Sequence, residues 1–376
     1  MLQRTVDIKT WMSLFILTFV NALFFIKYQE RATDHYLIVG VLLSFALPLI
    51  LFLSDSVKKY AKVLKYTDIL MVAILIAAAF YVFYKVPVET VNVDRWEIIT
   101  AIWKTFEKGE YAYGLQLDSG NRPGAMPFYF LLAYPFYLIG EFGLMPVIGL
   151  LIFVLTLRYA KIKINALSVC LCFLIVSPTF LWEIVTRSTL YLNGALVLFS
   201  IVYFLNNDKS KTKYLIISGI LFGLFLSIRF VFVLAYVVMA LYVIRKKQIT
   251  VKGAFVVAIS TIVSFALTFL PFVWGHFDEF MEMNPFIVQS TFLVPFYYTI
   301  MYFVLAVVLS FCCKKKEDVY CYSGFVLFAS ILVYFIYFIV TEGFDRAYFQ
   351  SMADISYFIF CVPFALFYIA KVLDRK

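Results

Sequence analysis

Long apolar runs alternate with short charged segments along almost the whole chain. The first runs long enough to cross a hydrocarbon core of about 30 Å as helices are residues 11–26, 36–53 and 67–84. Further runs follow at 142–157, 165–182, 190–205, 214–244, 253–273, 291–312, 321–340 and 353–370. Because the run 214–244 is interrupted at Arg229, we expect it to form two short helices. The pattern predicts an all-α polytopic membrane protein with about twelve transmembrane helices.

Basic clusters between the runs predict the topology. Lysine and arginine concentrate in cytoplasmic loops, and two such clusters lie at 58–65 and 158–163. An even number of crossings must separate them, so residues 127–139 cannot also cross; as a helix they reach only about 20 Å. We therefore expect a large first extracytoplasmic loop over 85–141 that carries interfacial helices. Both termini are predicted to be cytoplasmic, in a bacterial-type inner (plasma) membrane.

Composition supports this class. The 376 residues are 64% hydrophobic and only 15% charged, against about a quarter charged in soluble domains. The net charge of +9 does not indicate nucleic-acid binding, because the cations lie in the loops between spans. No GxxxxGK[ST], GxGxxG, GxSxG or HExxH motif occurs, so nucleotide hydrolysis and hydrolase chemistry have no support.

The predicted first outer loop begins with a charged amphipathic segment. Trp96, Ile99, Trp103 and Phe106 recur at helical spacing and form one apolar stripe, and Gly109 is a natural stop. Such a helix lies flat at a bilayer surface. Its start would therefore sit where lipid headgroups meet water.

Asp94 stands at that start and is the candidate catalytic residue. A carboxylate that deprotonates an acceptor hydroxyl must be near the headgroup plane and beside other charges, and Arg95 and Glu97 supply these as candidate substrate-binding residues. The alternative is that Asp94 is simply the N-cap of the helix.

Two arginines could bind a phosphate. Arg122 follows a turn-rich segment, and Arg229 interrupts an apolar run, where a charge is costly and usually functional or paired. A solvated loop charge is the alternative for Arg122, and a side chain that reaches the membrane surface is the alternative for Arg229.

Three further side chains complete the candidate binding set. Glu183 could bind a sugar hydroxyl or a metal, or could be a polar helix terminus. His276 has acidic neighbours but matches no compact metal site, so a solvated loop is the alternative. Tyr113 could stack on a sugar ring, although tyrosine is common at membrane interfaces. The metal ligands are unknown; a divalent cofactor, Mg or Mn, is left open.

These features together resemble a known family. An early acidic residue, an aromatic amphipathic helix, the step Gly109-x-Tyr111-x-Tyr113, the stretch RPGAMPFYFLLAYPFYLIGE and the hairpin SGILFGLFLSIRF look like the integral-membrane GT-C class of glycosyltransferases, mannosyltransferase-like members included. The resemblance covers a seven-span module at 67–273, preceded by an N-terminal hairpin and cytoplasmic loop at 1–66 and followed by an outer loop and three spans at 274–376.

The resemblance implies a function. Asp94 would be the base, and Arg229 would meet the phosphate of a polyprenyl-phosphate sugar donor, whose tail would need a cleft between the dipping helix and later spans. The sugar would pass, usually with inversion, to a periplasm-facing glycan or lipid-linked acceptor. Some members carry a D-x-D pair where this chain has WEIVTR with one acid, Glu183. The alternatives are a secondary transporter and a non-catalytic envelope-polysaccharide assembly protein.

Overall fold

The described part of the chain is helical, with no strand. A computed structural model describes residues 7–29, 41–42, 44–45, 49, 67–91, 93–117, 120–291 and 294–375. Most of the predicted second span at 36–53, the basic cluster at 58–65 and Asp118 lie outside the described residues.

The first half of the chain forms a set of packed α-helices and two short 3₁₀ helices. Their bounds are α1 Ile8–Gln29, α4 Thr67–Lys85, η4 Val88–Thr90, α5 Arg95–Glu107, η5 Ala112–Gly114, α6 Pro127–Ile139, α7 Leu144–Tyr159, α8 Ile164–Val176, α9 Pro178–Val185 and α10 Leu190–Asn206.

The second half begins with a helical hairpin. Its elements are α11 Thr212–Leu226, η6 Phe230–Phe232, α12 Val233–Arg245, α13 Val251–Val273, α14 Phe277–Glu282, α15 Pro285–Thr291, α16 Phe296–Cys312, α17 Lys316–Glu342, α18 Phe344–Tyr348, η7 Ile355–Cys361 and α19 Val362–Asp374. The expected break at Arg229 is confirmed, because this residue stands between α11 and η6.

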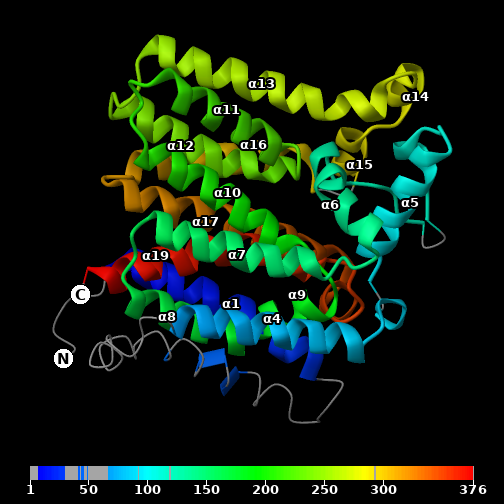
Figure 1. Cartoon of the computed structure of the whole chain (residues 1–376), viewed down its shortest axis with the longest axis horizontal. Coiled ribbons are helices and arrows are strands. Elements are labelled where there is room, and N and C mark those ends of the chain that lie inside the picture. Colours follow the sequence, from blue (N-terminus) through cyan, green and yellow to red (C-terminus); the bar gives the residue numbers. More distant parts are fainter. Residues whose placement is uncertain are drawn as a thin grey trace.

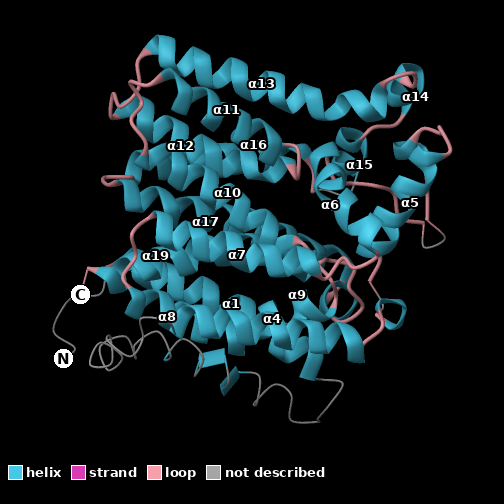
Figure 2. Ribbon diagram, in the orientation of Figure 1, coloured by secondary structure: helices cyan, strands magenta, loops and turns pink. Residues whose placement is uncertain are grey.

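Most helices lie side by side along one direction (Figure 1). Helix α11 packs along α13, α10 along α7, and α1 along α19. The loops therefore gather at two opposite ends of the bundle, as Figure 2 shows.

Five described helices are long and apolar enough to cross a membrane. They are Ile8–Tyr28, Asp68–Lys85, Val251–Val273, Lys316–Glu342 and Ile355–Asp374. A sixth span is formed if α8 and α9, which meet at a bend of 62°, are counted as one. The other apolar helices have 10–17 residues, so the figure of about twelve crossings stays a prediction.

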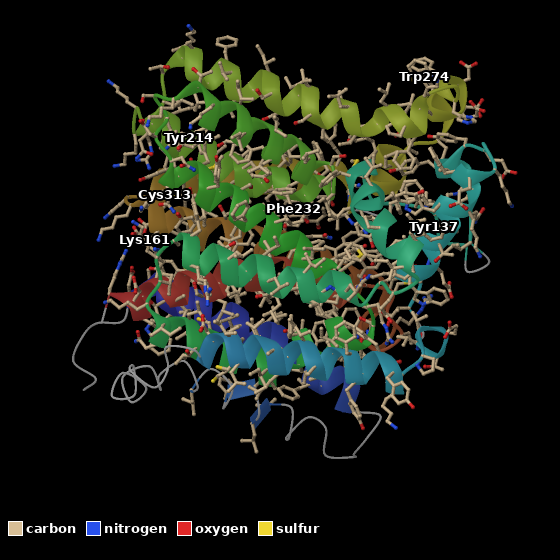
Figure 3. The ribbon with its side chains drawn as sticks, viewed as in Figure 1. Tyr137, Lys161, Tyr214, Phe232, Trp274 and Cys313 are labelled. Atoms are coloured by element: carbon tan, nitrogen blue, oxygen red, sulfur yellow. The ribbon has the colours of Figure 1, made fainter. Side chains whose placement is uncertain are left out.

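The two ends differ in character. One end, called here the basic end, carries Lys161 and lies opposite Tyr137 and Trp274 (Figure 3). There Lys371 Nζ donates to the Ala160 carbonyl at 2.9 Å. Both ends of the described chain lie there too, since Lys9 pairs with Asp318 at 2.7 Å beside the loop before α17. The opposite end holds α5, α6, α14 and α15 (Figure 1).

Local signals fix the helices at that opposite end. Helix α6 starts with Pro127, whose missing N–H costs nothing in the first turn, and stops at Gly140, whose φ of +79° suits glycine. Its start is anchored on the α11–η6 corner, because Tyr129 N donates to the Ser227 carbonyl at 3.2 Å. The corner that carries Arg229 is thus held against the beginning of α6.

Candidate functional site

Four side chains from distant parts of the chain meet at the end opposite the basic end. They are Arg95 at the start of α5, Tyr129 in α6, Arg229 before η6 and Tyr357 in η7, here called the Arg–Tyr cluster. Arg229 Cζ lies 5.9 Å from the ring centre of Tyr129 and 5.6 Å from that of Tyr357. Both distances are within the range of cation–π attraction. The cluster therefore joins the segment 85–141 to the start of the candidate span Ile355–Asp374.

Arg95 is fully engaged within the protein. Its Nη1 donates to Ser188 Oγ at 2.6 Å, and its Nη2 donates to Asp354 Oδ2 at 2.6 Å and to Ser356 Oγ. Its guanidinium also lies 5.2 Å from the ring centre of Trp182. Burial opposes its charge, but Asp354 and other neighbours outweigh this and raise the pKa of Arg95 above its usual range. Arg95 ties α5 to η7 and supplies a fixed positive charge.

Arg229 differs from Arg95 because it has no carboxylate partner among the described residues. Its Nε is buried and donates no hydrogen bond to them. A Cβ added at Gly124 would lie 3.8 Å from Arg229 Nη1, so the first-loop backbone passes close to the guanidinium. A guanidinium held between two aromatic rings without a counter-ion is suited to an incoming anion such as a phosphate.

Asp94 lies beside the cluster, and its carboxylate is held by Asn121. Asn121 Nδ2 donates to Asp94 Oδ2 at 2.7 Å. Asp94 occupies the N-cap position of α5, but its side chain makes no capping hydrogen bond; its backbone carbonyl instead accepts from Ile98 N at 2.9 Å. The carboxylate is half-buried. The Asn121 amide therefore orients the carboxylate, which does not cap the helix.

Tyr129 connects the charges of the site. Burial raises the pKa of its phenol; Thr189 and the positive charges of Arg229 and Arg95 oppose the shift, and Asp94 adds to it. One phenol thus feels both guanidinium groups and the Asp94 carboxylate. The phenol stays protonated at neutral pH and can donate a hydrogen bond.

The Glu183 side chain binds the start of the next helix, α10, and does not face an open site. Its side chain is completely buried, and Oε2 accepts from Tyr191 N at 3.1 Å in the first turn of α10. Its Oε1 has no partner among the described residues. The negative charge of this carboxylate also raises the pKa of Arg95. Glu183 therefore stabilises the positive charge of the cluster.

The other sequence-predicted residues are not part of the cluster, although the charge of Arg229 acts on the pKa of the Tyr113 phenol. Arg122 Nη2 reaches Gln116 Oε1 at 3.5 Å on the loop surface. Tyr113 is fully buried and donates to the Ala125 carbonyl at 3.1 Å, which fixes the loop before α6. Glu97 is exposed on α5.

His276 belongs to the segment between α13 and α14. Its Nδ1 lies 3.2 Å from Glu279 Oε1, and its ring centre is 5.8 Å from that of Tyr111. Through the described ranges of the chain, no three His, Cys, Asp or Glu side chains gather to hold a metal. A Mg or Mn cofactor stays a prediction, and no chemical step below depends on one.

Sequence reasoning missed Tyr129, Asp354, Ser356 and Tyr357. A signal existed for one pair, because an Asp followed by Ser two residues later is a helix-start pattern, and Asp354 Oδ1 accepts from Ser356 N at 2.9 Å. No local signal links this pattern to Arg95, since the contact spans 259 residues.

Comparison with protein-family models, curated proteins and solved structures gives no match.

An apolar groove ends beside the cluster. It has a volume of about 600 Å³ and is open along one side. Its lining comes from α6, α11 and α13 and includes Phe128, Leu131, Ile220, Leu224, Val263 and Leu267. We call it the α6–α13 groove. It lies between the short helix 127–139 and later helices, where a cleft was expected for a lipid tail.

Hydrogen bonds join this groove to the cluster. Phe128 N donates to Ser227 Oγ at 3.2 Å, and Ser227 Oγ lies 2.6 Å from the Thr268 hydroxyl at the groove's end. Arg229 follows Ser227 by two residues. An apolar chain in the groove would therefore have its polar head near Arg229.

The tie between Arg95 and Asp354 gives a stability prediction. Asp354→Asn is expected to lower the free energy of unfolding by about 2 kcal/mol at pH 7, because it removes a charged hydrogen-bond acceptor from Arg95. Burial alone would raise the pKa of Asp354, but Arg95 and Ser356 outweigh it and the pKa is lowered.

A carboxylate with a lowered folded-state pKa stabilises the protein above its unfolded pKa of about 4, and this stabilisation is lost as the pH falls through the folded value. Thermal unfolding in detergent from pH 7 to pH 3 should show the difference between wild type and Asp354→Asn shrinking below about pH 4. Asp345→Asn, at an exposed position nearby, is the control. A difference that is constant with pH would contradict the tie.

Proposed function

We propose that this chain is a membrane glycosyltransferase that moves a sugar from a polyprenyl-phosphate donor to a hydroxyl of a periplasm-facing glycan or lipid-linked acceptor. One observation carries the proposal: the Arg229 guanidinium, which has no carboxylate partner among the described residues, lies 5.9 Å from the Tyr129 ring centre, and the half-buried Asp94 carboxylate, held by Asn121, is near enough to raise the pKa of the same phenol. A base and an anion-binding group thus stand together at one end of the bundle.

The chemistry follows from these two groups. Asp94 takes the proton of the acceptor hydroxyl as its oxygen attacks the anomeric carbon of the sugar. The bond from that carbon to the phosphate oxygen breaks, and the donor leaves as polyprenyl phosphate. Arg229 offsets the negative charge that develops on the leaving phosphate. A single displacement of this kind inverts the configuration at the anomeric carbon.

The neighbours of these groups support the same step. Asn121 orients the Asp94 carboxylate through its 2.7 Å hydrogen bond. Arg95 forms an ion pair with Asp354. It therefore contributes positive electrostatic potential without pairing with the Asp94 carboxylate. In this proposal the basic end faces the cytoplasm, as positively charged loops do, and the Arg–Tyr cluster faces the other side.

A panel of polyprenyl-phosphate sugars tests the proposed function. The purified chain in lipid vesicles, supplied with a hydroxyl acceptor and a series of polyprenyl-phosphate sugars, is expected to release free polyprenyl phosphate from at least one donor. Release should require the acceptor. No release from any donor, with the protein folded, would overturn the proposal.

The α6–α13 groove gives a prediction about the donor tail. Ile220→Trp should fill the groove and raise the KM for a long-tailed donor about 15-fold, because excluding two methylenes from apolar contact costs about 1.6 kcal/mol. A donor with a short tail should be unaffected.

Ile217→Trp is the matched control, since Ile217 and Ile220 are both 40% exposed on α11 but only Ile220 lines the groove. An equal change in KM for both variants would show that the tail lies elsewhere.

A further inference from the structure

Three loops of the basic end converge at one corner. They are residues 207–211 between α10 and α11, 246–250 between α12 and α13, and 313–315 between α16 and α17. Lys316 Nζ donates to Asn206 Oδ1 at 2.9 Å, and Arg245 Nη2 donates to the Ser310 carbonyl at 2.9 Å. These bonds hold the loops together, on the side of the molecule where Tyr214 and Cys313 are labelled (Figure 3).

The corner has a large excess of positive charge. We use the name basic corner for the cations at this place. They are Lys209, Lys211, Lys213, Arg245, Lys246, Lys247, Lys314, Lys315 and Lys316. Three acids lie in or beside it: Asp208, Glu317 and Asp318. Glu317 pairs with Arg375 at 3.3 Å, and Asp318 pairs with Lys9 at 2.7 Å, while Asp318 Oδ2 also accepts from the Lys314 and Lys315 backbone N–H groups. Asp208 accepts from Ser210 Oγ at 2.8 Å. The described acids therefore do not balance the basic corner.

Positively charged side chains also lie close to one another within the basic corner. Burial lowers the pKa of Lys209, and the charge of Lys316 lowers it further. The Lys209 ammonium lies 5.1 Å from the ring centre of Phe204. Two ammonium groups held near each other are stabilised by an anion that binds between them.

The surroundings indicate which anion. The helices that leave this corner expose apolar side chains outside the α6–α13 groove: Ile217 on α11, Val251 and Phe255 on α13, and Val308 and Phe311 on α16. A ligand that follows these surfaces needs an anionic head and apolar chains. A soluble acidic protein would match the charge but not the apolar sides.

We propose that the basic corner binds the phosphate headgroup of an anionic phospholipid, with its acyl chains along the exposed sides of α11, α13 and α16. Lysine and arginine clusters at the end of membrane helices attract anionic lipid in this way, by about fivefold in affinity for each cation. This inference is independent of the proposed transferase, because the basic corner lies at the opposite end from the Arg–Tyr cluster.

The test compares lipid binding by full-length variants. The triple variant Lys209→Gln, Lys213→Gln, Lys316→Gln is set against a control triple at the other end, Lys85→Gln, Lys104→Gln, Lys108→Gln, whose lysines are exposed. Dioleoyl phosphatidylglycerol and phosphatidylcholine, which share the same chains, are titrated in detergent, and bound lipid is counted by native mass spectrometry.

Wild type and control are expected to prefer phosphatidylglycerol, and the corner variant to lose about 100-fold in affinity for it with no change for phosphatidylcholine. Unchanged thermal unfolding in detergent alone shows that the variant is folded. Retained preference in the corner variant would overturn the proposal. So would displacement of phosphatidylglycerol by a polyglutamate peptide at equal charge concentration, which would favour an acidic protein partner.

Discussion

Asp94→Asn is expected to lower the rate of sugar transfer by about 10³-fold without loss of the folded protein, the scale on which removing a general base acts. The asparagine keeps the size of the side chain and can still bond to Asn121, but it cannot accept the acceptor's proton. The measurement is the initial rate of acceptor glycosylation at saturating donor. Thermal unfolding reports whether the fold is retained.

The control for this prediction is on the same helix. Glu97→Gln removes a carboxylate that is exposed on α5, two residues beyond the cluster's Arg95. The Glu97→Gln variant should retain most of the wild-type rate. If Asp94→Asn turned over donor as fast as Glu97→Gln, Asp94 would not be the base.

Arg229→Gln is expected to lower kcat by 10²- to 10³-fold, which is about the effect of removing one group that stabilises transition-state charge. The reason is that the buried Nε of Arg229 has no partner among the described residues, whereas Arg95 is paired with Asp354. Arg229→Lys should recover only part of the rate, because an ammonium lacks the planar fork that binds phosphate.

Arg122→Gln serves as the control for charge alone. Arg122 contacts Gln116 on the loop surface, so its loss should change the rate by less than about threefold, the scatter expected for a surface charge. Equal loss in Arg122→Gln and Arg229→Gln would mean that net positive charge, and not the position of Arg229, drives the reaction.

Local signals predicted part of this structure well. The range 127–139 that was expected to form a short helix matches α6, which Pro127 and Gly140 delimit, and the start of α5 was predicted at Asp94, because capping and stop residues act within one turn. The break at Arg229 was likewise predicted from a charge within an apolar run. These features depend only on neighbouring residues.

Long-range contacts could not be predicted in the same way. Arg95 was expected to face substrate, yet the structure shows it bonded to Asp354 and Ser356 from the far end of the chain. Tyr357 joins Arg229 only because η7 packs against α10 and α17. Such contacts are set by helix packing, which no local pattern encodes.

The count of spans shows a related limit. Hydropathy counts apolar residues, whereas crossing depends on the length of the helix they form. Helices α10 and α16 have 17 residues each and α11 has 15, short of the roughly 20 needed to span a core of 30 Å upright. Length alone therefore leaves their crossing as a prediction.

The anomeric configuration of the product tests the account most directly. Purified wild type is given one polyprenyl-phosphate sugar of known configuration, and the glycosylated acceptor is examined by nuclear magnetic resonance while released lipid phosphate is counted. The account predicts one polyprenyl phosphate for each sugar transferred and an inverted anomeric centre, because Asp94 acts as base in a single displacement. A retained configuration, or transfer that proceeds unchanged in Asp94→Asn, would contradict it.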